Sequence, residues 1–170
     1  DYTPGIFETK MSHYDPEKKE QVHTTLAKQL ALYVTIYSPL QMAADLPQNY
    51  ERYLDAFQFI KDVPVDWQES VVLEAEPGDY ITIARKDKHS EDWFLGAITD
   101  ENARKTSLKL DFLTPRVKYK AIIYEDAPGA HWESNPKAYR IRTIQVHSKS
   151  KLSITLAPGG GTAIHFTPEK

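Results

Sequence analysis

Cysteine is absent from the 170-residue sequence. A chain without thiols forms no disulfide scaffold, no metal site with thiolate ligands and no cysteine nucleophile. The absence does not indicate a redox compartment, because a cysteine-free protein tolerates oxidising and reducing conditions equally.

Long apolar segments and an excess of basic residues are also missing. The longest apolar stretch, residues 30–37, is less than half of the roughly 18 residues that indicate a membrane span. The net charge is −3, from 21 basic and 24 acidic residues, whereas nucleic-acid-binding domains are basic. We therefore expect neither a membrane span nor a nucleic-acid partner.

Several short motifs that carry chemistry do not occur. The sequence contains no Gly-x-Gly-x-x-Gly, no phosphate-binding loop and no Gly-x-Ser-x-Gly. Its six histidines never occur as His-x-His or His-Glu-x-x-His, the spacings that bring two imidazoles to one metal ion. The residues alone therefore predict no metal site in this chain.

The first third of the sequence reads as helical. Asp15 and Pro16 are suited to the N-cap and the first position of a helix over residues 16–37. Residues 26–37 are apolar on nearly all sides, which is typical of a helix buried on nearly all sides. Such burial requires either a partner outside this chain or a large face of a sheet. A second, amphipathic helix is predicted from Pro47 to Asp62.

From Trp67 onward, short β-rich runs alternate with turn clusters. The expected strands are residues 71–75, 80–87, 92–99, 106–112, 118–125, 138–147, 151–157 and 161–167. No helix-length segment separates them, which favours an antiparallel β-sandwich of about eight strands preceded by two helices, and thus a mainly β fold. The apolar positions of the sixth run break the period of two, so we expect a β-bulge near Thr143.

The alternating positions of these runs predict the core of the sandwich. Its expected members are Ile81, Ile83, Trp93, Leu95, Leu108, Leu110, Phe112, Ile123, Leu152, Ile154, Leu156, Ile164 and Phe166. Residues 67–170 are accordingly expected to fold alone, with the boundary near residues 63–67.

Carboxylates and exposed aromatics are the candidate functional groups. The pairs Glu74/Glu76, Glu91/Asp92 and Asp100/Glu101 are interpreted as solvated turn or edge charges, because sequence proximity does not set the separation that a glycosidase requires. Asp45 and Asp1 lie in loops beside buried elements, where functional residues concentrate. Trp132, in a long loop, and Tyr139 form a candidate platform for stacking on a sugar, whereas Trp93 alternates with Leu95 and is assigned to the core.

Long segments of the chain resemble the C-terminal third of glycoside hydrolase family 97. The resemblance rests on Asp1-Tyr-Thr-Pro-Gly-Ile-Phe7, Gln29-Leu-Ala-Leu-Tyr-Val-Thr-Ile-Tyr-Ser-Pro-Leu-Gln-Met-Ala-Ala-Asp45, Asp55-Ala-Phe-Gln-Phe-Ile-Lys-Asp62, Leu73-Glu-Ala-Glu-Pro-Gly-Asp-Tyr80, Thr99-Asp-Glu-Asn102 and Ala157-Pro-Gly-Gly-Gly161. It is nearest to the periplasmic α-glucosidases of starch-utilisation systems. One departure is Arg116, where members commonly have glycine after the proline.

This resemblance implies an enzyme with an N-terminal β-sandwich, a catalytic (β/α)8 barrel and a C-terminal β-sandwich linked to oligomerisation. In the α-glucosidase branch, glutamates act as general acid and base with inversion, and a calcium ion lies in the site. Another branch consists of retaining α-galactosidases with an aspartate nucleophile. The catalytic and calcium-binding glutamates lie upstream of the segment that matches Asp1, so no catalytic and no metal-binding residue is expected here.

On this basis, residues 1–66 are expected to be the last part of the barrel, with residues 16–37 as its last helix, and residues 67–170 the C-terminal sandwich. The complete enzyme is expected to be periplasmic and to hydrolyse terminal α-glucosidic bonds of starch-derived oligosaccharides. Its partners would be that substrate, the rest of the barrel, the N-terminal domain and further copies of itself. The segment alone should be inactive and structural.

Three alternatives remain open: an α-galactosidase of the same family, a non-catalytic carbohydrate-binding module that uses Trp132 and Tyr139, and a pure assembly module. Asp1 and Tyr2 are the candidate substrate-binding residues, because the segment before the Pro4-Gly5 turn would be the carboxyl end of the last barrel strand, where barrel active sites form.

Overall fold

The computed structural model describes residues 3–169. Asp1 and Tyr2, the two residues expected to contact substrate, lie outside the described residues, as does Lys170. The helical elements are the 3-10 turn η1 (Met11–His13), α1 (Leu26–Thr35), α2 (Pro47–Glu51) and α3 (Leu54–Asp62). The strands are β1 (Trp67–Glu76), β2 (Tyr80–Asp87), β3 (Trp93–Thr99), β4 (Arg104–Lys109), β5 (Tyr119–Asp126), β6 (Tyr139–Val146), β7 (Lys151–Leu156) and β8 (Gly161–Pro168).

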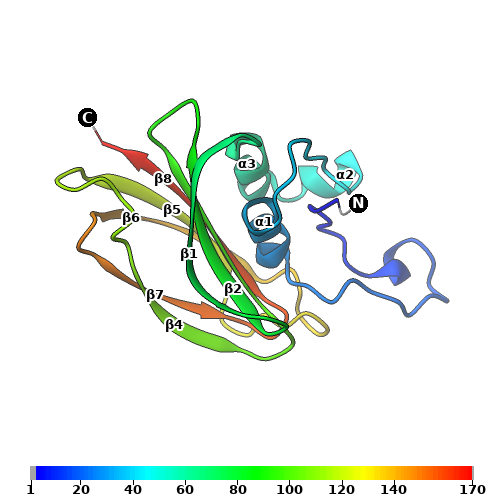
Figure 1. Cartoon of the computed structure of the whole chain (residues 1–170). Coiled ribbons are helices and arrows are strands. Elements are labelled where there is room, and N and C mark those ends of the chain that lie inside the picture. Colours follow the sequence, from blue (N-terminus) through cyan, green and yellow to red (C-terminus); the bar gives the residue numbers. More distant parts are fainter. Residues whose placement is uncertain (1–2, 170) are drawn as a thin grey trace.

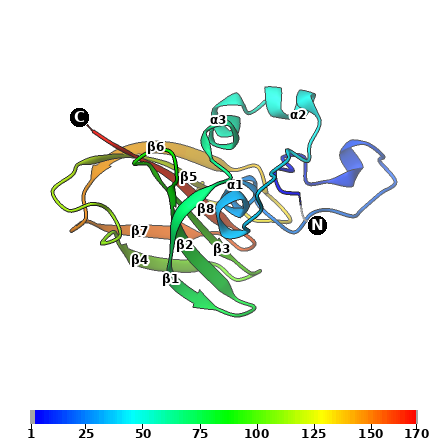
Figure 2. The same cartoon turned by 45° about the horizontal axis from the view of Figure 1, so that its top comes forward.

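The strands form two antiparallel sheets, which confirms the predicted sandwich of eight strands. A six-stranded sheet has the order β1-β2-β3-β8-β5-β6, and β4 pairs with β7 in a two-stranded sheet. The small sheet covers one face of the large one, and the helices cover the opposite face (Figures 1 and 2). The molecule therefore has three layers, with the large sheet in the middle.

The inner core fills the space between the two sheets. It contains most of the residues that alternation predicted, among them Trp93, Leu95, Ile123, Ile154 and Phe166. Ile81 and Ile83 are exceptions. Ile81 belongs to neither core and lines a cleft. Ile83 faces the helices, while its neighbour Ala84 faces the small sheet. Alternation identified the two faces of β2 correctly but could not tell which face belonged to which layer, since both are covered.

The outer core lies between the helices and the large sheet. Leu30 and Val34 of α1 pack with Phe94 of β3, Tyr124 of β5 and Ala163 of β8 (Figure 1). At Gly96 the helix comes so close that a Cβ atom would lie 2.6 Å from the carbonyl oxygen of Ala31. The all-round apolarity of α1 is thus accounted for by a sheet face within this chain.

The first helix is shorter than predicted. It begins at Leu26, and the hydroxyl of the N-cap Thr25 accepts a hydrogen bond from the Lys28 amide at 3.2 Å, so Asp15 and Pro16 do not start it. Lys10 and Gln21 instead form an antiparallel bridge. The reason is that residues 17–20 are all exposed charged side chains, with no apolar stripe to hold a helix against the sheet.

The second helix is interrupted. Residues 47–62 form α2 and α3, separated at Arg52 and Tyr53. Tyr53 leaves helical geometry, with φ −139° and ψ 47°, and its ring packs edge-on against Phe7 and Tyr139. Tertiary aromatic contacts therefore override the helical periodicity at this point.

The bulge predicted near Thr143 is absent, because β6 pairs with β5 in unbroken register. Ile141 faces the outer core and Ile144 the inner core. Apolar residues therefore occur at both odd and even positions because β6 is covered on both faces. Register shifts occur instead in β1, between Trp67 and Glu69 and between Val72 and Glu74.

Candidate functional site

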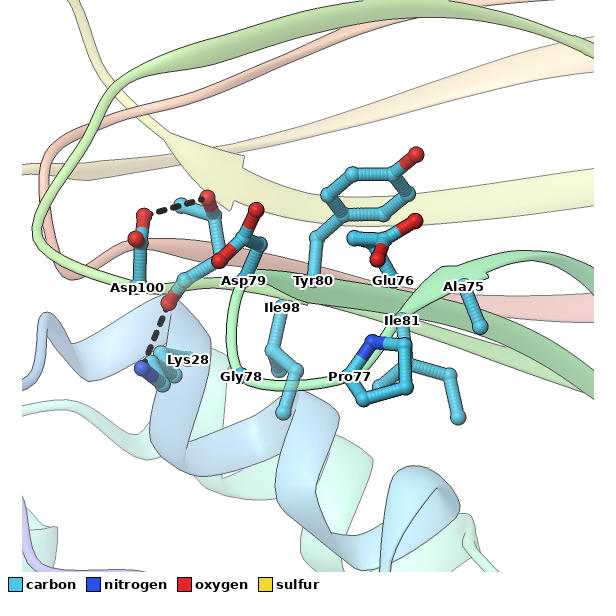
Figure 3. Close-up of a pocket in the computed structure, with 11 residues that line it drawn as sticks. Lys28, Ala75, Glu76, Pro77, Gly78, Asp79, Tyr80, Ile81, Ile98 and Asp100 are labelled. Carbon is cyan, nitrogen blue, oxygen red and sulfur yellow. Dashed lines mark hydrogen bonds between the residues drawn. The ribbon is translucent and has the colours of Figure 1, made fainter.

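A cleft lies where the β1–β2 hairpin approaches the first turn of α1. Its volume is about 390 Å³. Ala75, Pro77, Ile81 and Ile98 provide its apolar wall, and Lys28 enters from the helix (Figure 3). The remaining lining residues are Glu76, Gly78, Asp79, Tyr80, Thr99 and Asp100.

Lys28 is held in place by the start of its helix. The Thr25 cap fixes the first turn of α1, and the Lys28 Nζ donates a hydrogen bond to the Thr99 carbonyl oxygen at 2.6 Å. Burial lowers the pKa of Lys28, and the nearby Asp100 carboxylate opposes that shift. The result is a half-buried ammonium group at the edge of an apolar wall.

Asp100 is engaged with its own loop. Its carboxylate accepts hydrogen bonds from the Asn102 backbone at 2.9 Å and from the Asn102 side chain at 3.0 Å, and these bonds lower its pKa. Glu76 and Tyr80 point away from α1 in Figure 3. The cleft is large enough for a small group.

Trp132 lines a second recess of about 370 Å³, together with His23, Lys28, Asp100 and Glu101. Its ring lies 4.1 Å from that of His23, and it packs so tightly on Gly159 that a Cβ there would approach the Trp132 Cβ to 2.5 Å. These contacts explain how the indole is held in the long loop after β5.

Tyr139 belongs to a different cluster. Its hydroxyl donates to Asp55 Oδ1 at 2.6 Å, and its ring contacts Tyr53. Burial, followed by the Asp55 carboxylate, raises the pKa of Tyr139 well above its usual value. Within residues 3–169 no ring contact joins Tyr139 to Trp132, so the pair does not form the platform that the sequence predicted.

The other predicted carboxylates connect parts of the fold. Glu74 accepts hydrogen bonds from Thr82 at 3.2 Å and Thr106 at 2.9 Å, and thereby joins the two sheets. Asp92 lies 2.6 Å from the His165 Nε2. Glu91, which is exposed, forms an ion pair with the largely buried Lys86 at 2.9 Å. Glu74 and Asp92 are therefore largely shielded side chains that hold elements together, and not the solvated charges that the sequence interpretation expected.

Asp45 is a hydrogen-bonding hub for the N-terminal segment. Its Oδ2 accepts from the backbone amides of Phe7 and Glu8, both at 2.7 Å, and its Oδ1 accepts from Asn49 at 2.6 Å. The pKa of Asp45 is lowered, because these bonds outweigh its partial burial. Its loop position therefore serves to tether the chain before α2.

Sequence reasoning missed the buried carboxyl of Asp126, at the end of β5. Asp126 Oδ2 accepts from the amides of Ala157 at 2.9 Å and Gly161 at 3.0 Å. Burial raises the pKa of Asp126 to about 6. A Cβ at Gly160 would lie 2.0 Å from this oxygen. In the sequence, the run of three glycines at residues 159–161 was the feature that could have indicated such a close contact.

Glu125, the residue before it, is also buried, but on the opposite face of the strand. Its Oε1 accepts from Arg140 Nε at 2.6 Å and Arg142 Nε at 2.7 Å, both on β6. Glu125 therefore binds β6, and Asp126 binds the segment between β7 and β8. Neither residue lines the cleft beside Lys28.

The fold is a β-sandwich with an attached helical layer. Residues 66–167 match the family model described as glycosyl-hydrolase 97 C-terminal, oligomerisation. The chain belongs to glycoside hydrolase family 97 and corresponds to its C-terminal part.

Solved relatives share both sequence and fold. A family 97 glycoside hydrolase from Pseudoalteromonas sp. strain K8, solved in complexes with panose and with acarbose, is 46% identical, with a TM-score of 0.93 over 100% of this chain and 26% of that chain. A β-arabinopyranosidase structure, 21% identical with a TM-score of 0.78 over 97% of this chain and 24% of its own, shares the fold.

A curated relative from Bacteroides thetaiotaomicron, a retaining α-galactosidase, is 35% identical over 166 residues, which are 96% of this chain and 24% of that protein. The chain thus spans about a quarter of the length of the relatives it matches.

The described residues contain neither a metal-binding cluster of side chains nor a membrane-spanning helix. No group of three or more His, Asp or Glu side chains in residues 3–169 could hold a metal ion. None of the helices in that range is both long and apolar enough to cross a membrane.

Proposed function

We propose that the complete enzyme hydrolyses terminal α-glucosidic bonds of starch-derived oligosaccharides in the periplasm. The observation that carries this proposal is the higher identity to the Pseudoalteromonas enzyme, 46%, than to the retaining α-galactosidase, 35%. The former was solved with panose and with acarbose, and panose is built from α-linked glucose.

The present segment would supply structure and assembly, not chemistry. This role is supported by the carboxylates of Glu74, Asp100 and Glu91, which are engaged in a sheet contact, a loop and an ion pair, and by the oligomerisation description of residues 66–167. Calcium, if the complete enzyme binds it, would then have its ligands upstream, and chelation should leave the fold of residues 67–170 unchanged.

The rest of the barrel is the proposed cover for an exposed apolar segment after α1. Ile36, Tyr37, Leu40, Met42 and Leu46 are all exposed, Leu40 by 73%. A run of exposed apolar side chains on an otherwise polar surface marks an interaction site. Its position next to α1 and α2 fits residues 1–66 as the last part of a (β/α)8 barrel.

The test compares two substrates with the full-length enzyme. Release of p-nitrophenol from the α-glucoside should be at least about a hundredfold faster than from the α-galactoside, a difference of about 2.8 kcal/mol in transition-state stabilisation. The reverse preference would assign the enzyme to the α-galactosidase branch. The 170-residue chain alone should release no glucose from maltose, and activity above that of a matched blank would contradict its structural role.

Asp1 and Tyr2 remain the proposed contacts to substrate. In the full-length enzyme, Asp1→Asn should lower kcat/KM at least about tenfold, or about 1.4 kcal/mol, with an unchanged melting temperature. Asp15→Asn, on an exposed turn of the same segment, is the control. Wild-type kinetics in Asp1→Asn, or an equal loss of activity and folded fraction, would remove Asp1 from the site.

A further inference from the structure

Residues 4–8 are buried or half-buried, although they form no helix or strand. Buried backbone amides need hydrogen-bond partners, and outside regular elements these partners must come from side chains or from other stretches of backbone. The four amides of residues 5–8 all donate to two side chains, Gln29 and Asp45. Two side chains therefore hold four consecutive residues of the main chain.

Gln29 holds the first half of this segment. It lies on α1 and is fully buried. Its Oε1 accepts hydrogen bonds from the amides of Gly5 at 2.9 Å and Ile6 at 3.1 Å, and its Nε2 donates to the Thr24 Oγ1 at 2.9 Å. The oxygen and the nitrogen of this buried side chain are thus both engaged, so an apolar substitute would leave two backbone amides without an acceptor.

Asp45 holds the second half through its Oδ2, which accepts from the amides of Phe7 and Glu8. Its Oδ1 accepts from the Asn49 side chain and from the Leu46 amide at 2.8 Å. Because both oxygens are engaged, the carboxylate cannot rotate away from the segment. The lowered pKa of Asp45 keeps it ionised at neutral pH, and charged acceptors form the stronger hydrogen bonds.

Two tyrosines close the turn at Gly5. This residue has a φ of +97°, and a Cβ atom there would lie 2.5 Å from the Tyr33 hydroxyl oxygen. The Tyr50 hydroxyl donates to the Gly5 carbonyl oxygen at 2.7 Å and accepts from the Asp45 amide at 2.9 Å. Burial raises the pKa of Tyr50 to about 12, so the hydroxyl keeps the proton that this bond requires. The turn therefore has a conformation that favours glycine and no space for a side chain.

The anchored segment follows Asp1 closely in the sequence. Only Tyr2 and Thr3 separate Asp1 from residue 4, and consecutive Cα atoms are about 3.8 Å apart. A displacement of residues 4–8 would therefore reach Asp1 with little slack. Contacts to a substrate are sensitive to such shifts, because a misplacement of about 1 Å can cost on the order of a hundredfold in rate.

We propose that Gln29 and Asp45 are positioning residues of the complete enzyme, which hold the main chain of residues 5–8 and thereby set where Asp1 meets the substrate. This inference rests on the substrate contact proposed above for Asp1. It gives α1 a second role, because the helix that packs on the sandwich also carries Gln29.

The experiment measures kcat/KM and the melting temperature of full-length variants with the preferred p-nitrophenyl glycoside of the enzyme. Gln29→Met keeps the length of the side chain but removes its hydrogen bonds, and it should lower kcat/KM at least about fivefold. Gln29→Glu keeps an acceptor for the two amides, and the Thr24 hydroxyl can donate to its other oxygen, so kcat/KM should stay within about twofold of the wild type.

Leu95→Ala is the control for a loss of stability alone, because Leu95 is buried in the inner core on the other side of the large sheet. This variant should melt at a lower temperature than the wild type. Its kcat/KM should be unchanged when it is assayed well below that temperature.

A double-mutant cycle with Asp1→Asn tests whether Gln29 acts through Asp1. In the Asp1→Asn background, Gln29→Met should lower kcat/KM by less than about twofold, because the contact through which it acts is already altered. Asp45→Ala, at a half-exposed position, should give the same pattern, and it decides the question where Gln29→Met does not fold.

The outcomes separate this inference from the proposed function. A full loss in both backgrounds, or a lower melting temperature with wild-type kcat/KM, would overturn the positioning role while Asp1→Asn itself stays impaired. Wild-type kinetics in Asp1→Asn would overturn the proposed substrate contact and the positioning role together.

Discussion

The two hydrophobic cores of this chain are formed by different secondary-structure elements. The inner core is made by strands and by the β4–β5 loop, with β4 and β7 closing over the large sheet. The outer core needs both halves of the sequence, because α1 and α3 pack on side chains of β3, β5 and β8. The sequence pattern changes from helical to strand-like near residue 66. The outer core nevertheless contains residues from both sides of that position, so the change in pattern is not a boundary in packing.

Removal of residues 1–66 should have the largest effect. The inner core remains complete, so residues 67–170 should still unfold cooperatively. Phe94, Tyr124 and Ala163 would become exposed, and the shortened chain should bind a hydrophobic dye and melt well below the 170-residue chain. Absence of any cooperative melt would show that the sandwich depends on its helical layer, and an unchanged melting temperature would show that the layer contributes nothing.

Single truncations compare the two cores directly. Leu95→Ala empties space in the inner core and Leu30→Ala in the outer core, and both side chains are fully buried. Each should cost about 2–5 kcal/mol of unfolding free energy, measured by urea denaturation. Val72→Ala, at an exposed position, is the control. A cost below about 1 kcal/mol for Leu30→Ala would contradict a packed outer core.

The buried carboxyl of Asp126, at the end of β5, makes the stability of the chain depend on pH. Its pKa is about 6 in the folded chain, against roughly 3.9 for an exposed aspartate. Because the folded state keeps the proton longer, its contribution to stability is full below about pH 4 and is lost as the pH rises to about 6.

Asp126→Asn keeps a carbonyl acceptor for the two amides but does not ionise. The variant should remove this loss and be more stable than the wild type by about 2 kcal/mol at pH 7, with little difference near pH 4. Urea denaturation at several pH values measures the difference. Asp111→Asn, on an exposed turn, should not reproduce it, and parallel curves for wild type and Asp126→Asn would refute the assignment.

The smallest expected effect is at Arg116, in the turn after Pro115. Arg116 has a φ of +64°, a left-handed conformation that costs a non-glycine residue about 1 kcal/mol. Arg116→Gly should therefore stabilise the chain by up to about 1 kcal/mol, less the entropy that glycine adds to the unfolded state. Gly78→Ala, at φ +91° in open space, should destabilise by a similar amount. Destabilisation by Arg116→Gly would count against strain at this turn.

Local pattern predicted much of the fold, and tertiary contacts account for the rest. Alternation and turn residues located all eight strands, because each half-buried strand carries its own period. The start of α1 and the break at Tyr53 depend on contacts with the sheet and with the aromatic cluster. The residues that make these contacts are far apart in the sequence, so a short stretch of sequence does not reveal them. Tertiary contacts also explain Ile141 and Ile144. They point to opposite faces of β6, and both faces of this strand are covered.

The site was less predictable than the fold. The sequence identified Asp100, Glu101 and Trp132 as candidates but could not show that they share a recess with Lys28. That recess forms where α1, the β3–β4 loop and the loop after β5 meet, and its members are far apart in the chain. Asp126 was missed because a single acidic residue at a strand end is unremarkable until its burial is known.

The central claim is that the helical layer and the sandwich unfold as one unit through their shared outer core. Differential scanning calorimetry of the 170-residue chain tests it most directly. The account predicts a single transition in which the calorimetric and van't Hoff enthalpies agree. Two resolved transitions, the first of which removes only the signal of residues 1–66, would contradict it.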